Sequence, residues 1–194
     1  AMQSAVPVGE GSMAAIIGLE DERINEICGR VAQEQGGVVA AVNFNSPGQV
    51  VIAGHTAVVD TAIGQLKEAG AKRAMPLPVS APFHTSLMQP AGEQLAEAMA
   101  GIELQAPAIP VVHNVHAQTE ENPGEIRRLL VEQISSPVQW TRCVRAITGL
   151  GAGHLIECGP GKVLSGLNRR IDKALQSYAL EAPDALRAAL GELS

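Results

Sequence analysis

The order of patterns between residues 13 and 79 constrains the fold of this chain more than any other feature. Met13–Leu19 is a short apolar run and predicts a strand. Asp21–Gln35 carries apolar residues at helical spacing and ends at a glycine pair, so it predicts a helix. Val38–Asn45 and Gln49–Ala53 are β-rich, and the turn signal Ser46-Pro47-Gly48 between them predicts a hairpin.

The same region continues with a second helix and a fourth strand. Thr56 can cap a helix that ends near Gly70, and Lys72–Val79 is again β-rich. The resulting order, β-α-β-β-α-β, is that of a ferredoxin-like unit, in which both helices lie on one face of a four-stranded antiparallel sheet. The fold class is α/β, and such a unit names no function by itself.

From His84 onward the pattern alternates between helices and strands. The sequence predicts helices over 87–100, from Asn122, from Ser136, over 162–175 and over 183–193, and strands over 108–115, 154–158 and 177–180. About three strands are too few for a parallel sheet that is covered on both faces. We therefore expect this second part to dimerise or to lack its first half.

Composition and charge argue against several classes of function. The 194 residues carry a net charge of −6 and only 2% aromatic residues, without a basic block, which argues against nucleic acid as a partner. The three cysteines are far apart, which is typical of a reducing compartment rather than of disulfides or zinc. No run of 18 apolar residues and no signal peptide is present, so we expect a cytoplasmic protein without membrane contact.

His84 is the candidate acid–base residue. It lies in a rigid loop between a predicted strand and a predicted helix, among Pro76, Pro78 and Pro82. An ordinary surface histidine in a proline-rich connector is the alternative. No GxSxG motif accompanies it, and Cys143 and Cys158 fall on apolar faces that predict buried, inert thiols.

Three other motifs are weaker candidates for a functional site. His113 and His116 form an HxxH pair, but on a strand these positions point to opposite faces, so a shared metal is not expected. Gly159-Pro160-Gly161-Lys162 between a strand and a helix is either a tight turn or a weak anion site. Asn43 and Asn45, which share a face by alternation, either line a polar cleft or cap the hairpin.

Four stretches carry a resemblance to a known family. They are VNFNSPGQVVIAG at 42–54, LPVSAPFH at 77–84, PVQW at 137–140 and ECGPGKVL at 157–164. In this order they resemble the malonyl-CoA:acyl-carrier-protein transacylases. The resemblance implies a ferredoxin-like subdomain inserted in an α/β-hydrolase-like acyltransferase domain. It also implies that the GHSxG nucleophile and the carboxylate-binding arginine precede Ala1, since Met2-Gln3 looks like the end of the arginine segment.

The resemblance divides the chain into three parts. Residues 1–7 would end a helix of the large domain, residues 8–79 would form the ferredoxin-like subdomain, and residues 80–194 would be the C-terminal part of the large domain. The missing N-terminal portion of the same protein would then be a partner, and the 194-residue chain alone would be inactive.

The implied reaction moves a malonyl group from CoA to the phosphopantetheine thiol of acyl carrier protein through a serine acyl-enzyme, in fatty-acid biosynthesis. His84 would be the acid–base residue, oriented by the backbone carbonyl of Gln139. Phe83 and Asn45 would line the substrate site, and Phe83 would favour malonyl over branched units. The basic residues Lys162 and Arg169 would meet the acidic carrier protein. No cofactor and no metal are implied, since malonyl-CoA is a substrate.

Two other functions stay open from the residues alone. One is a free-standing ferredoxin-like module that binds a partner without catalysis. The other is a metal hydrolase that uses His84, His113 and His116.

Overall fold

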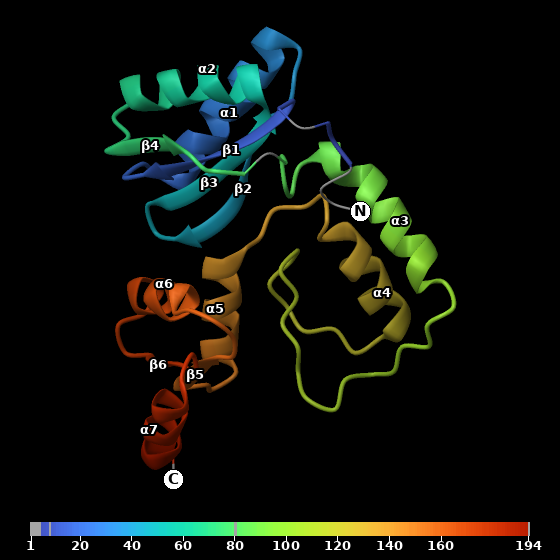
Figure 1. The fold of residues 1–194 in the computed structure, drawn as a ribbon, viewed down its shortest axis with the longest axis vertical. Coiled ribbons are helices and arrows are strands. Elements are labelled where there is room, and N and C mark those ends of the chain that lie inside the picture. Colours follow the sequence, from blue (N-terminus) through green and yellow to red (C-terminus); the bar gives the residue numbers. More distant parts are fainter. Residues whose placement is uncertain (1–4, 8, 80, 194) are drawn as a thin grey trace.

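The computed structural model of this mixed α/β chain describes residues 5–7, 9–79 and 81–193. The first part contains β1 (Gly11–Ile17), α1 (Asp21–Gln35), β2 (Val39–Ser46), β3 (Gln49–His55), α2 (Thr56–Glu68) and β4 (Arg73–Pro76). The predicted order β-α-β-β-α-β is therefore the observed one. The strands form one sheet in the order β2-β3-β1-β4, and all neighbouring pairs are antiparallel (Figure 1).

Both helices of this part cover one face of the sheet (Figure 1). The buried stripe of α1 is Ile24, Ile27, Cys28 and Val31, as its helical spacing predicts. We call the core between helices and sheet the helix-side cluster; it includes Ile16, Ile52 and Leu66, all fully buried.

The opposite face of the sheet buries a smaller group. Met13, Val42, Val51 and Ala53, which we call the loop-side cluster, pack together there with the half-buried Leu77 and Phe83. Because Phe83 precedes His84, this face of the sheet supports the loop that carries the candidate base.

The second part is mostly helical. It contains a short 3-10 helix (Ser86–Met88), α3 (Gln89–Met99), α4 (Pro123–Glu132), α5 (Trp140–Gly149), β5 (His154–Glu157), α6 (Val163–Ile171), β6 (Gln176–Ala179) and α7 (Pro183–Leu193). α3 and α4 lie side by side, and β5 and β6 form a two-stranded parallel sheet (Figure 1).

Two secondary-structure predictions for this second part are wrong. Residues 108–115 form no strand and have a single bridge, Val112 to Thr119, because Pro107 and Pro110 remove the backbone donors that a strand needs. The helix predicted from Ser136 begins at Trp140 instead. Residues before a proline favour extended backbone, and Val138 continues in that form and bridges Asn43 of β2 in parallel.

The predicted helix end at residues 1–7 falls largely on residues 1–4, which lie outside the described residues. Residues 5–7 form a bend and not a helix. No helix in the described ranges is long and apolar enough to cross a membrane.

Candidate active site

The loop that carries His84 leaves the sheet beside β1. Leu77 still donates its backbone N–H to Met13 O at 2.9 Å, and the chain then turns through Pro82 to Thr85. His84 has a φ of +63°, in the left-handed region that residues with a side chain rarely occupy. Such strained backbone persists only where its surroundings hold it, and it gathers at functional sites.

The imidazole of His84 is held from α4. Its Nδ1 lies 3.1 Å from the backbone oxygen of Gln133, the residue that ends α4. A carbonyl can only accept, so we assign the proton of the neutral ring to Nδ1. The lone pair is then on Nε2, and the half-buried ring is ready to take a proton there.

This contact corrects the sequence prediction that Gln139 orients His84. The Gln139 carbonyl accepts from the backbone N–H of Cys143 at 2.8 Å, because Gln139 caps α5 and its oxygen belongs to the first helical turn. Gln133 was missed. The sequence did contain a signal for such an acceptor. The last carbonyls of a helix lack helical partners, and a helix was predicted to begin at Asn122, so free carbonyls were to be expected at its end.

Phe83 lies against the loop-side cluster of Met13, Val42, Val51 and Ala53. The sheet therefore fixes the residue immediately before His84 by apolar contact. Its contact with a substrate stays a prediction.

The region around Asn43 and Asn45 joins the sheet to the second part of the chain. The register of β2 against β3 shifts between Ala41 and Asn43 and again between Phe44 and Ser46, so simple alternation fails here. Phe44 donates its N–H to Val138 O at 2.9 Å, and Thr141 Oγ1 donates to Phe44 O at 3.1 Å. Asn45 is half-buried at this junction, and its role as a cleft residue stays a prediction.

His113 and His116 lie in a turn and not on a strand, so the prediction that they point apart is wrong. Their rings make an edge contact with centroids 6.0 Å apart. Burial lowers the pKa of His113, the nearby His116 lowers it further, and Glu120 opposes both. Among the described residues no group of three or more possible metal ligands occurs.

The start of α6, directly after the Gly159–Lys162 loop, already holds a carboxylate of the chain itself. The carboxylate of Glu157 accepts from the backbone N–H groups of Leu164 at 3.1 Å and Ser165 at 2.8 Å, and from Ser165 Oγ at 2.9 Å. The two backbone donors belong to the first turn of α6, so the chain itself fills the position that an external anion would take. The tight-turn alternative therefore describes this loop better.

Cys143 and Cys158 differ in burial. Cys143 is buried as predicted, and burial raises the pKa of its thiol. Cys158 is exposed, contrary to the prediction, because it follows the end of β5, where the two-stranded sheet leaves it uncovered. Within the described ranges no serine or cysteine side chain hydrogen-bonds to His84, and its bond is to the Gln133 oxygen.

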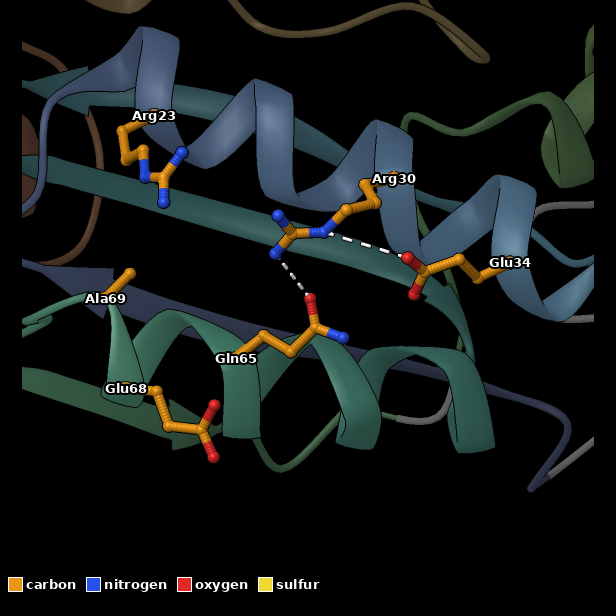
Figure 2. A pocket seen from close by; sticks show the side chains of 6 residues that line it. All are labelled: Arg23, Arg30, Glu34, Gln65, Glu68 and Ala69. Carbon is orange, nitrogen blue, oxygen red and sulfur yellow. Dashed lines mark hydrogen bonds and ion pairs between the residues drawn. The ribbon is translucent and has the colours of Figure 1, made fainter.

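A hollow of about 540 Å³ between α1 and α2 lies away from this site (Figure 2). It is on the helix-covered face of the sheet, opposite the loop-side cluster that supports Phe83. Its lining charges balance, since Arg23 and Arg30 face Glu34 and Glu68, and Arg30 donates to Gln65 Oε1 at 2.8 Å. We therefore do not assign the reaction to this hollow.

The comparisons with known proteins agree over nearly the whole chain. A family model described as an acyl transferase domain matches residues 2–186. The malonyl CoA-acyl carrier protein transacylase of Escherichia coli K12 is 53% identical over 189 residues, which are 97% of this chain and 60% of that protein. The relative from Bacillus subtilis with the same name is 40% identical over 192 residues, 99% of this chain and 60% of that protein.

Solved structures give the same result. A malonyl-CoA:acyl carrier protein transacylase from Xanthomonas oryzae superposes with a TM-score of 0.94 at 50% identity, over 98% of this chain and 60% of that one. A malonyl-transacylase in complex with a type II polyketide acyl-carrier protein superposes with a TM-score of 0.94 at 49% identity, over 98% of this chain and 61% of that one. The chain thus spans about 60% of the length of these relatives.

Proposed function

This chain belongs to the acyl transferase domain family, and on that premise we propose that it is the histidine-bearing part of a malonyl-CoA:acyl-carrier-protein transacylase. The observation that carries the proposal is the bond between His84 Nδ1 and Gln133 O, which leaves Nε2 as a base. The similarity extends over 97–99% of the chain, so a free-standing module limited to its first part is not favoured.

The proposed reaction has two acyl transfers. His84 Nε2 takes the proton of a serine hydroxyl while the serine oxygen attacks the malonyl thioester, and the imidazolium returns the proton to the departing CoA thiolate. The thiol of the carrier protein then gives its proton to Nε2 and attacks the acyl-serine, whose oxygen recovers the proton. We place the serine in the portion of the family protein that this chain does not span. The chemistry needs no cofactor.

The finer fold assignment belongs to the same proposal. We assign residues 8–79 to a ferredoxin-like subdomain and residues 80–194 to the C-terminal part of an α/β-hydrolase-like domain. The antiparallel order β2-β3-β1-β4 with both helices on one face supports the first assignment. The parallel pair β5–β6 supports the second, since a two-stranded sheet is too small to form a domain by itself.

Phe83 and Asn45 are the proposed substrate neighbours. Phe83 is adjacent to His84 and held against the loop-side cluster, so its ring could fill the space that a branched acyl unit would need. Discrimination of one methylene is worth about 1–3 kcal/mol, so the preference for malonyl would be modest.

We test the proposal in a chimera that joins this chain to the segment of the Escherichia coli relative that it does not span. Replacing His84 with Ala should lower malonyl transfer to carrier protein by roughly 10²–10⁴-fold, because the proton transfers lose their base. Mass spectrometry of the carrier protein measures the transfer. The matched control is His154→Ala, which changes an exposed histidine on β5 and should leave transfer unchanged. Normal transfer by His84→Ala would remove His84 from the mechanism.

Arg169 and Lys162 are the proposed contacts for the acidic carrier protein. Both are exposed; Arg169 donates to Ser177 O at 3.5 Å, and Lys162 lies 4.0 Å from Glu181. The charge reversal Arg169→Glu in the same chimera should raise the KM for carrier protein and leave the KM for malonyl-CoA unchanged. An unchanged KM for carrier protein would exclude Arg169 from the interface.

A further inference from the structure

The turn that carries His84 is closed by a side chain next to it. Thr85 is only 3% exposed, and its Oγ1 donates to the backbone oxygen of Pro82 at 2.7 Å. This short bond spans Phe83 and His84. The residue at φ +63° therefore lies inside a loop that the Thr85 hydroxyl closes.

Both ends of this closed turn are anchored. Pro82 is buried against β1, where a side chain on Gly11 would place its Cβ 2.3 Å from Pro82 Cδ. At the other end, Thr85 O accepts the N–H of Met88, which is fully buried, and the 3-10 helix begins there. The hydroxyl bond joins these two fixed points, so it determines how the backbone passes through His84.

We propose that Thr85 is a positioning residue: its hydroxyl holds the backbone of His84 in the left-handed conformation that aims Nδ1 at Gln133 O. Left-handed backbone is unfavourable for histidine and needs such support. Without the bond, the loop can relax toward ordinary φ, the ring leaves the Gln133 carbonyl, and the Nδ1–H tautomer loses its preference. The part of this inference that concerns catalysis rests on the proposed function; the part that concerns the tautomer does not.

The first test reads the His84 tautomer in this chain by ¹⁵N chemical shifts of the imidazole ring. Wild type and Thr85→Ser, which keeps the hydroxyl, should show a protonated Nδ1 and a bare Nε2. Thr85→Val, which has nearly the same shape without the hydroxyl, should show a mixture with a protonated Nε2. Thr148→Val is the matched control, since Thr148 Oγ1 also donates to the carbonyl three residues earlier, at Arg145, and lies on α5. A wild-type ring spectrum in folded Thr85→Val would overturn the proposal.

The second test does not require Thr85→Val to be well folded. Glycine accepts φ +63° without strain, so the hydroxyl should matter less in a His84→Gly background. The drop in melting temperature caused by Thr85→Val should therefore be smaller in His84→Gly than in wild type, as a double-mutant cycle measures. Folding of the double variant where Thr85→Val alone fails would support the proposal. Equal drops in the two backgrounds, or failure of both variants to fold, would overturn it.

The third test uses the chimera. Thr85→Val should lower kcat for malonyl transfer severalfold with the KM for malonyl-CoA unchanged, and Thr85→Ser should restore kcat. If the tautomer changes while the chimera transfers no malonyl at all, the positioning role stands and the proposed function fails. If transfer is normal and Thr85→Val changes neither kcat nor tautomer, the positioning role fails and the function stands.

Discussion

At the scale of single residues, the site depends on a position without a side chain. Gly11 lies where β1 passes closest to Pro82, and any Cβ there would meet Pro82 Cδ at 2.3 Å and Pro82 N at 3.0 Å. A proline ring is rigid and cannot turn away, so the strand or the loop must move. Because the loop carries His84, this movement would reach the candidate base.

Gly11→Ala should therefore destabilise the chain by about 1–3 kcal/mol, the usual cost of overpacking. Thermal unfolding measures the change. The matched control is Gly64→Ala on α2, where a Cβ meets nothing within 4 Å and alanine favours the helix by up to about 1 kcal/mol. A Gly11→Ala protein as stable as wild type would show that the close approach to Pro82 is relieved at no cost.

Sequence reasoning proposed His84 as the candidate base but did not predict that its ring contacts the Gln133 carbonyl, and the reason is physical. The imidazole and its three neighbouring prolines are local information, visible in residues 76–88. The acceptor at Gln133 is a backbone atom 49 residues away, and every residue has such an atom. Only the path of α4 decides which carbonyl is near, so Gln139 was as plausible as Gln133 until the fold was known.

At the scale of elements, the beginning of α6 is held by the strand before it. Burial alone would raise the pKa of Glu157, but the hydrogen bonds from Ser165 and Leu164 to its carboxylate outweigh this effect and leave the pKa below its ordinary value. A carboxyl group with a lowered pKa stabilises the fold above its ordinary pKa, and this stabilisation is lost as the pH falls through the lowered value.

We expect Glu157→Gln to reduce stability at neutral pH and to flatten the acid side of the stability curve, because the amide accepts the α6 bonds less strongly and does not titrate. Urea unfolding at a series of pH values below 7 measures both effects. Glu97→Gln on the exposed face of α3 is the control and should keep the wild-type curve. An acid limb as steep in Glu157→Gln as in wild type would mean that other groups cause it.

The elements themselves were predicted unequally well. The helical stripe of α1 and the cap of α4 are local, and Asn122 Oδ1 accepts from Gly124 N at 2.8 Å, as its position before Pro123 predicted. The strand predicted over residues 108–115 failed because Pro107 and Pro110 remove backbone donors from this apolar run, which keeps only the bridge from Val112 to Thr119 among the described residues. The register shifts in β2 also escaped prediction; they flank Asn43 and Phe44, next to the bridge that Val138 makes from a distant segment.

At the scale of the whole molecule, the two parts of the chain differ in how much they bury. The four-stranded sheet encloses the helix-side cluster, whereas β5 and β6 are four residues each and leave Ile156, Val163 and Leu164 exposed. Val163 is 73% exposed at the start of α6. Local stability follows buried apolar contact, so it should differ between these parts.

Amide hydrogen exchange should show this difference in one experiment on the wild-type chain. The amides of β1 and β3 should exchange only through global unfolding, and those of β5 and β6 should exchange much faster, through local opening. Mass spectrometry of exchanged peptides measures both. Equal protection of β3 and β6 would mean that the chain unfolds as one cooperative unit.

Because the acceptor of the His84 ring is a backbone atom, positions 84 and 133 differ in the substitutions that they tolerate. The oxygen that receives Nδ1–H belongs to the peptide group of residue 133, and all twenty amino acids carry that oxygen. The residue at position 133 can therefore be substituted while the bond persists, whereas any substitution of His84 removes the imidazole. A mutational scan of side chains can detect a role of the imidazole at position 84 but passes over the carbonyl at position 133, although the two are hydrogen-bonded. What must be preserved at position 133 is the position of the backbone, not the identity of the side chain.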